Sequence, residues 1–175
     1  MGIVFRPMEE VDLPMLHRWL NEPGVVRWWE GQDVSWEGVL RHYGTPATPS
    51  TEHWIASLDG RDIGWLQCYL ALDNPDETDG WWDFDIDRTA AGIDYLLAAP
   101  TERGRGVGSG MIRAFALEVV LARHTEWTQV CAGPFAANVA SCRALAKAGF
   151  RIVGLVEDDD DDGEGPCQLM VLDRQ

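Results

Sequence analysis

The sequence is short of basic residues and lacks paired cysteines and long hydrophobic runs. Lys and Arg together number 14 against 29 Asp and Glu, which gives a formal net charge of -15. A surface this acidic repels polyanions, so neither nucleic acid nor an anionic membrane is expected as a partner. No stretch approaches the roughly 18 apolar residues that a membrane-spanning helix needs. The excess of negative charge favours a cationic ligand.

The cysteines are scattered singly along the chain, and no CxxC pair occurs. Neither a zinc site nor a disulfide framework is therefore indicated, and no metal is expected. No basic segment followed by an apolar one opens the sequence, so no signal peptide is expected and a cytoplasmic location is predicted. Reduced thiols, mostly in the core, suit that location. The four cysteines are Cys68, Cys131, Cys142 and Cys167.

The predicted secondary structure is mixed α/β, and no repeat or long linker divides the chain. Residues 1–175 are therefore expected to form one domain with a substantial core. Asp12 is a candidate N-cap for a helix over 13–21. A β-hairpin is predicted over 53–72, joined around Asp59-Gly60 by a loop of two residues or more. Further strands are predicted over 93–98, 130–132, 150–153 and 167–172, and helices after the glycines at 104–110 and over 137–147.

The segment Arg103–Gly110 has a glycine at every second position from Gly104 onward. It lies between a predicted strand and a predicted helix, so unshielded backbone N–H groups would meet the positive end of the helix dipole. Such an arrangement binds phosphate or pyrophosphate. The P-loop and the dinucleotide fingerprint are both excluded by their residue spacing. An ordinary surface turn is the alternative, which the flanking strand and helix disfavour.

Arg103-x-x-Gly106-x-Gly108 resembles the acyl-coenzyme A pyrophosphate motif of the GNAT N-acetyltransferase superfamily, and Cys142–Phe150 resembles its second helix and terminal signature. The resemblance implies an α/β (α+β) GNAT fold, with a mixed central sheet of about six to seven strands and helices on both faces. A V-shaped splay between two parallel central strands would hold the co-substrate, acetyl-coenzyme A. Asn138 would bond to the coenzyme, although an ordinary helix N-terminal residue is an equal alternative there. The cofactor-binding residues implied are Leu96, Leu97, Ala98, Arg103, Gly104, Arg105, Gly106, Val107, Gly108, Ser109 and Asn138.

Aromatic and acidic motifs, among them Trp28-Trp29, Asp79–Trp82 and Gly92–Asp94, are similar to those of aminoglycoside 6'-N-acetyltransferases. That resemblance implies transfer of the acetyl group of acetyl-coenzyme A to an amino group of an aminoglycoside, expected at the 6' position, which gives resistance. Carboxylates and flat aromatic faces suit such a polycation. Core packing is the alternative for any tryptophan, and is expected for Trp54 and Trp65. The implied substrate-binding residues are Trp28, Trp29, Asp79, Trp82, Asp83 and Asp94.

Asp94 is the candidate catalytic residue of a direct transfer within a ternary complex. An ammonium group has no lone pair, so a base must remove a proton before the amine attacks the thioester. Asp94 could do this directly or through a water, and the alternative is that it only positions the amine by ion pairing. A backbone N–H near Leu97 is expected to stabilise the oxyanion of the tetrahedral intermediate.

Two positions depart from the family that the chain resembles. Leu145 stands where the family has a tyrosine, the presumed acid for the leaving thiolate, and Gly133 stands where it has an aspartate. Water, Cys142 or Ser141 could supply the missing proton, and weaker or differently selective activity is predicted. Alternative functions are acyl transfer to a siderophore precursor or another polyamine-like small molecule, and a weakly active coenzyme A-binding module. Either a monomer or a homodimer fits the sequence.

The acidic run 157–164 is expected to be an exposed loop, because like charges repel one another. The alternative is that its edge reaches the cationic substrate.

Overall fold

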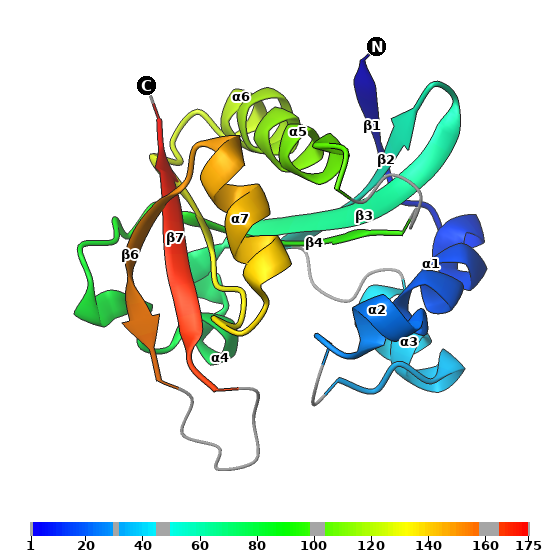
Figure 1. Ribbon diagram of the computed structural model, residues 1–175, viewed down its shortest axis with the longest axis horizontal. Helices are drawn as coiled ribbons and strands as arrows, with labels where there is room; N and C mark the ends of the chain where they lie inside the picture. The colour runs from blue at the N-terminus through cyan, green and yellow to red at the C-terminus, as the bar shows by residue number, and fades with distance from the viewer. Residues whose placement is uncertain (1, 30–31, 45–49, 99–103, 158–164, 175) are drawn as a thin grey trace.

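The computed structural model describes residues 2–29, 32–44, 50–98, 104–157 and 165–174 (Figure 1). Its strands form one sheet of seven in the order β1-β2-β3-β4-β5-β7-β6. Among these described strands, β4 and β5 run parallel and every other neighbouring pair is antiparallel. The strands are β1 (Ile3–Pro7), β2 (Thr51–Leu58), β3 (Arg61–Leu70), β4 (Ala91–Leu97), β5 (Gln129–Ala132), β6 (Arg151–Val156) and β7 (Cys167–Asp173).

The helices fall into two groups, with α5, α6 and α7 in one and α1, α2 and α3 in the other (Figure 1). A π-helical stretch, Phe115–Val120, joins α5 to α6. A short α4 lies between β3 and β4. None of the helices in the described ranges is both long and apolar enough to cross a bilayer. The helices are α1 (Leu13–Leu20), α2 (Pro23–Val26), α3 (Trp36–Tyr43), α4 (Pro75–Thr78), α5 (Val107–Ala114), α6 (Leu121–Arg123) and α7 (Val139–Ala148).

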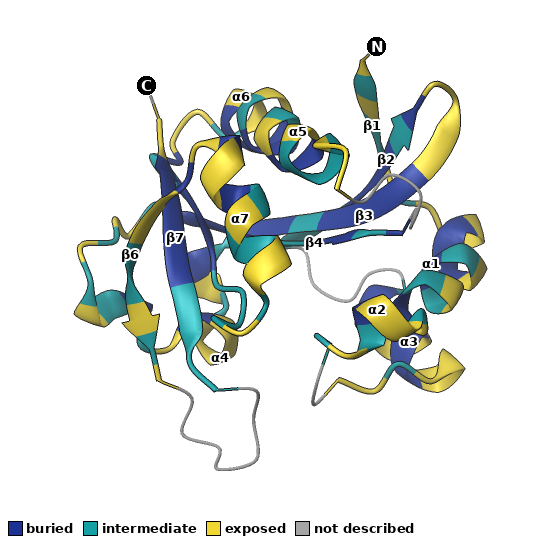
Figure 2. Cartoon of the chain, in the orientation of Figure 1, coloured by how far each residue is buried: buried dark blue, intermediate teal, exposed yellow. Residues whose placement is uncertain are grey.

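Both faces of the central strands are buried by these helices, as the dark blue along most of β3 in Figure 2 indicates. Side chains of successive strand residues point to opposite faces. Trp54 of β2 and Leu66 of β3 accordingly pack in the cluster with α5 and α7, whereas Ile55 and Trp65 pack in the cluster with α1 and α3. The predicted core positions of Trp54 and Trp65 are confirmed.

A splay opens between the two parallel strands. β4 pairs with β5 only at Ala91–Val130 and Gly92–Cys131, within the described strands, although β4 continues to Leu97. β5 ends at Ala132, where it pairs with β7 instead. The second half of β4 therefore borders a gap on the side away from β3. The predicted mixed sheet with a V-shaped splay and helices on both faces is confirmed.

The hairpin prediction is also confirmed, since β2 and β3 are joined by a two-residue turn. Asp59 has φ 51° and Gly60 φ 75°, the positive pair that a tight hairpin turn with right-handed strand twist requires.

Asp12 does not cap the first helix with its side chain, so that prediction is wrong. A 3₁₀ turn, Glu10–Asp12, precedes α1 and places Asp12 in the helical region. Its carboxylate instead accepts hydrogen bonds from the Arg6 guanidinium at 2.6 and 2.8 Å and from the Glu9 N–H. The guanidinium of Arg6 lowers the pKa of Asp12.

Candidate active site

The glycine loop turns directly into α5. Gly104 and Gly106 have φ of 76° and 82°, in the left-handed region that glycine adopts without strain. Gly106 is the residue before the first turn of α5 and offers no side-chain cap. The Ser109 hydroxyl donates to the Gly106 carbonyl oxygen at 2.9 Å, which closes the turn. The first turn of α5 therefore presents backbone N–H groups beside glycines, as the sequence predicts for an anion site.

A cavity of about 430 Å³ lies against this loop, β4 and α7, and we call it the glycine-loop cavity. Two basic residues of α7, Arg143 and Lys147, line it, and no Asp or Glu does so among the described residues. Of the eleven residues predicted to bind a coenzyme, the following seven line it: Leu96, Leu97, Gly104, Gly106, Gly108, Ser109 and Asn138.

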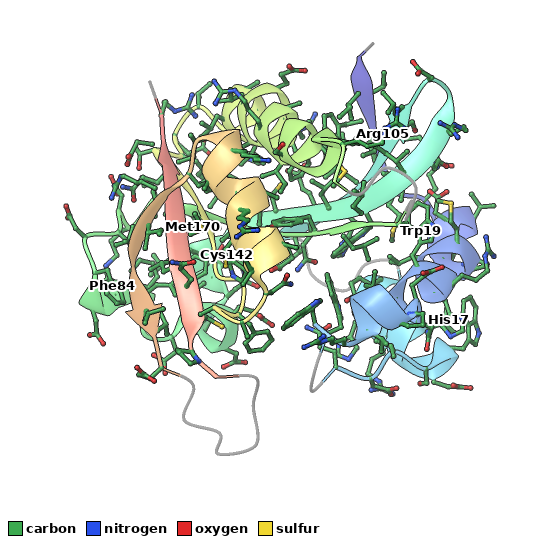
Figure 3. The ribbon with its side chains drawn as sticks, viewed as in Figure 1. His17, Trp19, Phe84, Arg105, Cys142 and Met170 are labelled. Carbon is green, nitrogen blue, oxygen red and sulfur yellow. The ribbon has the colours of Figure 1, made fainter. Side chains whose placement is uncertain are left out.

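Of the remaining four predicted coenzyme residues, the three in the described part of the chain do not line this cavity. Val107 packs toward the core beneath α5. Arg105 lies exposed on the loop before α5 (Figure 3). Arg103 lies outside the described residues. Ala98 is buried, and its N–H donates to the Ile63 carbonyl oxygen of β3 at 2.8 Å.

The Ala98 hydrogen bond fixes which way the backbone of β4 faces. Backbone groups of an antiparallel strand alternate in direction. Since Ala98 bonds to β3, the backbone groups of Leu97 and Tyr95 face the other edge, where the splay opens. Among Leu96, Leu97 and Ala98, the backbone of Leu97 therefore faces the splay, whereas the other two face β3.

Asn138 caps α7. Its Oδ1 accepts a hydrogen bond from the Ser141 N–H at 3.2 Å, so the carboxamide oxygen acts as an ordinary helix N-cap. The residue nevertheless lines the glycine-loop cavity.

A second and larger cavity, of about 860 Å³, we call the acidic cavity. No Lys or Arg lines it among the described residues. All the predicted substrate residues line it, and several further acids and aromatic residues join them. Its carboxylates belong to Asp76, Glu77, Asp79, Asp83, Asp94 and Glu157.

Asp94 projects from β4 into the acidic cavity and is held by its neighbour on β3. Gln67 Nε2 donates to Asp94 Oδ2 at 2.6 Å. Burial raises the pKa of Asp94 to about 6 because water no longer stabilises the charge, and the hydrogen bond from Gln67 opposes the rise. The negative charge of Glu77 raises the pKa further. Such a carboxylate is poised to exchange a proton near neutral pH.

The two cavities meet at Trp28 and Trp29, which line both of them. Trp29 is fixed because its Nε1 donates to the Tyr43 hydroxyl at 3.1 Å. The face of Trp28 already carries the Arg27 guanidinium, 4.5 Å from the ring centroid. These rings therefore form a shared aromatic wall between the glycine-loop cavity and the acidic cavity.

Both residues of the second tryptophan pair line the acidic cavity, but they are buried to different extents. Trp81 is buried, whereas Trp82 is only partly buried and carries the Arg88 guanidinium 5.0 Å from its ring centroid. The two arginine contacts were not predicted, because a cation above a ring depends on the folded path of neighbouring loops.

The two departures from the resembled family occupy different environments. Leu145 has no exposed surface and packs in the cluster beneath α5, so it does not line either cavity. Gly133 lines the acidic cavity, and a Cβ there would lie 3.9 Å from the Trp81 ring. Gly133 therefore leaves room in the acidic cavity, and Leu145 contributes to stability rather than to the site.

Gln67 and Tyr95 were missed by the sequence analysis, which named Ser141 only as a possible source of the missing proton. Gln67 lies opposite Asp94 only because of the strand register. The Tyr95 hydroxyl lies 2.6 Å from Ser141 Oγ, across the interface between β4 and α7. The period-two alternation of β4 places Tyr95 opposite in direction to Asp94, but only the fold brings α7 against it.

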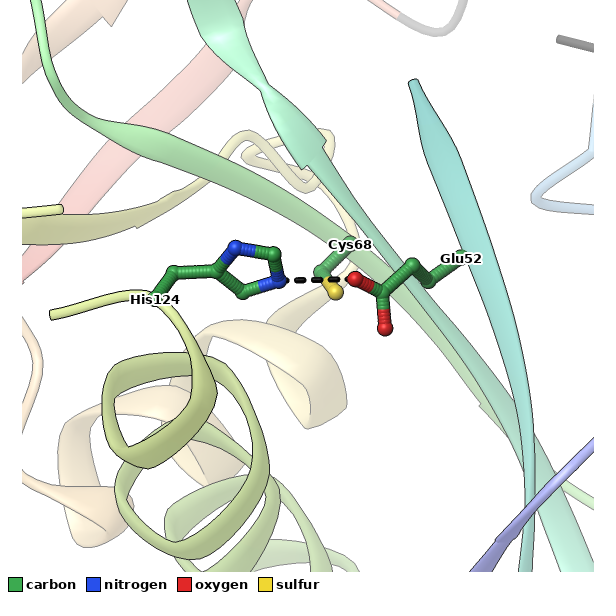
Figure 4. Close-up of side chains that lie close together, drawn as sticks. All are labelled: Glu52, Cys68 and His124. Atoms are coloured by element: carbon green, nitrogen blue, oxygen red, sulfur yellow. Dashed lines mark hydrogen bonds and ion pairs between the residues drawn. The ribbon is translucent and has the colours of Figure 1, made fainter. Parts of the chain in front are cut away.

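One group of side chains outside both cavities could in principle hold a metal, namely Glu52, Cys68 and His124 (Figure 4). Glu52 Oε1 lies 2.7 Å from His124 Nε2, and Arg123 Nε approaches the other carboxylate oxygen at 3.5 Å. Burial raises the pKa of Cys68, which disfavours the thiolate that a metal would need. Glu52 thus links β2 to the end of α6 through its contacts with Arg123 and His124.

Comparison with known proteins connects this geometry with a family. Residues 9–157 match the family described as acetyltransferase (GNAT) domain. The aminoglycoside N(6')-acetyltransferase type 1 of Klebsiella pneumoniae is 36% identical over 178 residues, which covers 99% of this chain and 84% of that protein.

Solved structures agree in fold over nearly the whole chain. AAC(6')-Ib in complex with paromomycin and acetyl-coenzyme A has a TM-score of 0.84 at 35% identity, covering 99% of this chain and 94% of that one. AAC(6')-Ib in complex with coenzyme A and kanamycin has a TM-score of 0.81 at 34% identity, covering 99% and 95%.

Proposed function

Because this chain belongs to the GNAT acetyltransferase family, we propose that it transfers the acetyl group of acetyl-coenzyme A to the 6' amino group of an aminoglycoside. The observation that carries the proposal is the pairing of two cavities of opposite charge. The glycine-loop cavity is lined by Arg143 and Lys147, and the acidic cavity by carboxylates alone among its described charged residues. A polyanionic donor and a polycationic acceptor would thus meet at Trp28 and Trp29.

The donor is proposed to lie in the splay between β4 and β5. Its pyrophosphate would bind the N–H groups at the start of α5, and its pantetheine arm would pair with the backbone of Tyr95 and Leu97, which faces the splay. The oxyanion formed during transfer would accept from a backbone N–H near Leu97. The solved complex of AAC(6')-Ib with acetyl-coenzyme A supports this donor.

The acceptor amine is proposed to reach the thioester through the acidic cavity. Asp94 would accept its proton, because a carboxyl whose pKa is about 6 is mostly ionised at neutral pH yet basic enough to take a proton during attack. Asp79 and Asp83 would bind other ammonium groups of the antibiotic, and Trp82 would pack against a sugar ring. Gly133 leaves space that would alter which antibiotics fit.

Thiol release tests the proposal. Purified protein and acetyl-coenzyme A are incubated with kanamycin, tobramycin or a hydroxylysine-like amine, and free thiol is measured over time. Release with kanamycin or tobramycin is expected. Release with the hydroxylysine-like amine alone would favour the siderophore-precursor alternative. Coenzyme A binding without release for any amine would reduce the protein to a coenzyme-binding module.

A further inference from the structure

The phenol of Tyr95 lies on the thioester side of the proposed reaction. Tyr95 directly follows Asp94 on β4, and side chains of successive strand residues point to opposite faces. Asp94 accordingly lines the acidic cavity, whereas Tyr95 lines the glycine-loop cavity. One strand therefore presents a carboxylate to the acceptor and a phenol to the donor, beside the splay where the two would meet.

The hydroxyl of Tyr95 is held in place. It lies 2.6 Å from Ser141 Oγ in the first turn of α7, and Ser141 also lines the glycine-loop cavity. The ring packs against the main core cluster and the hydroxyl contacts Ser141, so the side chain is held at both of its ends. This contact bridges β4 and α7, the two elements on either side of the donor.

Other proton donors near the glycine-loop cavity are engaged or differently placed. The Ser109 hydroxyl donates within its own loop, and the Asn138 side chain caps α7. The Cys142 thiol is directed at a backbone carbonyl oxygen 3.6 Å away and does not line the cavity. Arg143 and Lys147 are exposed on α7, where their charges suit phosphate groups. Tyr95, with Ser141, is thus the donor pair beside the splay in the described part of the cavity.

We propose that Tyr95 is the catalytic acid that protonates the departing thiolate of coenzyme A, with Ser141 as its positioning partner. The assignment rests on the proposed acetyl transfer. The ammonium group first passes one proton through Asp94 to solvent, and the amine nitrogen then forms its bond to the acetyl carbon and loses a second proton to Asp94. The carbon–sulfur bond then breaks, its electron pair stays on sulfur, and sulfur takes the phenolic proton. Tyr95 regains a proton from the Ser141 hydroxyl, which regains one from solvent.

The surroundings keep this acid in its protonated form. Burial raises the pKa of Tyr95, and the negative charge of Asp94 adds to the rise. The phenol therefore carries its proton through the neutral pH range, where Asp94 has lost its own. A base and an acid with separated titration ranges are the pair that such a transfer needs.

Tyr95→Phe tests the assignment because it keeps the ring and removes only the hydroxyl. We expect kcat for thiol release from acetyl-coenzyme A to fall about 100-fold, the lower end of what a positioned proton donor contributes. Coenzyme A affinity, measured by calorimetry, should be unchanged. An activated donor, S-acetyl-4-nitrothiophenol, should react at equal rates with both proteins, because its thiolate leaves without a proton.

Thr128→Val is the matched control. It removes a hydroxyl from another close pair, Thr89 Oγ1 and Thr128 Oγ1 at 3.0 Å, which lies outside both cavities. Its kcat should equal that of the native protein. An unchanged kcat in Tyr95→Phe would overturn the Tyr95 assignment and leave the proposed function standing. A native protein that releases no thiol with any amine would overturn both.

Ser141→Ala provides a second route if Tyr95→Phe unfolds, which thermal melting would reveal. Loss of the 2.6 Å partner should lower kcat with acetyl-coenzyme A less than Tyr95→Phe does, and again spare the activated donor. A fall of equal size with both donors would mean a structural role for this pair, and would contradict the assignment.

Discussion

Three features of the folded chain set the pKa of Asp94. The walls of the acidic cavity shield its carboxylate from water, and Gln67 donates a hydrogen bond to it. The negative charge of Glu77 disfavours its ionised form. The residue type could be recognised from the sequence through Gly92–Asp94, but the contact with Gln67 could not, because it depends on the register between β3 and β4. The raised pKa is likewise a property of the folded chain.

The pH dependence of the rate follows from that pKa. We expect kcat/KM for the amine to rise with pH through about 6 as Asp94 loses its proton. Asp94→Asn should lose most of the rate, and the remaining rate should no longer show this rise with pH. A steady-state profile with kanamycin measures both, and an Asp94→Asn enzyme with the native profile would remove Asp94 from the chemistry.

Stability should respond in the opposite direction. The folded-state pKa of Asp94, about 6, lies above its ordinary value of 3.8, so the folded state holds this proton more tightly than the unfolded state does. The contribution of Asp94 to stability therefore falls as pH rises from about 4 to about 6 and stays low above it. Asp94→Asn should raise Tm at neutral pH, and less so near pH 4. A lower Tm at neutral pH would contradict the raised pKa.

Leu145 should not accept a catalytic group without cost. It is fully buried, so Leu145→Tyr overfills the core and should destabilise the fold by about 1–3 kcal/mol. No gain in kcat is expected, because Tyr95 is proposed as the acid. Thermal melting and thiol release measure the two effects. A faster enzyme would show that the site lacks a proton donor.

At the scale of elements, the sequence correctly predicted the turns and loops that depend on local residue patterns. The hairpin turn at Asp59-Gly60 and the glycine loop before α5 follow from residue types that adopt positive φ. The π-helical stretch at Phe115–Val120 and the hydrogen-bonding of Asp12 were not predicted. These features depend on packing and on a partner, Arg6, from another element.

The glycine loop makes a testable element. Gly106→Ala meets no atom within 4 Å, so its cost is the positive φ alone, about 1 kcal/mol. The same change should weaken coenzyme A binding, because the loop must shift to relieve the strain.

Gly60→Ala is the control for that variant, since Gly60 also has positive φ and open space but lies in the hairpin turn. Both variants should lose similar stability, and only Gly106→Ala should lose affinity in calorimetry. Equal affinities would mean that the loop does not hold the coenzyme.

At the scale of the whole molecule, the net charge of -15 conceals two opposed sites. Basic residues line the glycine-loop cavity and acids line the acidic cavity, so a polyanion and a polycation can bind the same chain. The family, the fold and the resemblance to aminoglycoside 6'-N-acetyltransferases were predicted correctly from motifs. The acidic run 157–164 lies outside the described residues except for Glu157, which lines the acidic cavity.

Placement of charge, rather than its sum, should decide acceptor binding. Asp83 lines the acidic cavity and Asp85, two residues later, does not. Asp83→Asn should weaken binding of the acceptor by about 1 kcal/mol, which raises the acceptor KM roughly fivefold. Asp85→Asn should leave that KM unchanged. The KM for acetyl-coenzyme A should change in neither. Equal acceptor KM values for the two variants would mean that only total charge matters.

The product of the reaction tests the central claim most directly. Kanamycin incubated with the protein and acetyl-coenzyme A would be examined by mass spectrometry and NMR. The account predicts one added acetyl group on the 6' nitrogen, absent when Asp94→Asn replaces the native protein. Unmodified kanamycin, or an acetyl group at another position, would contradict it.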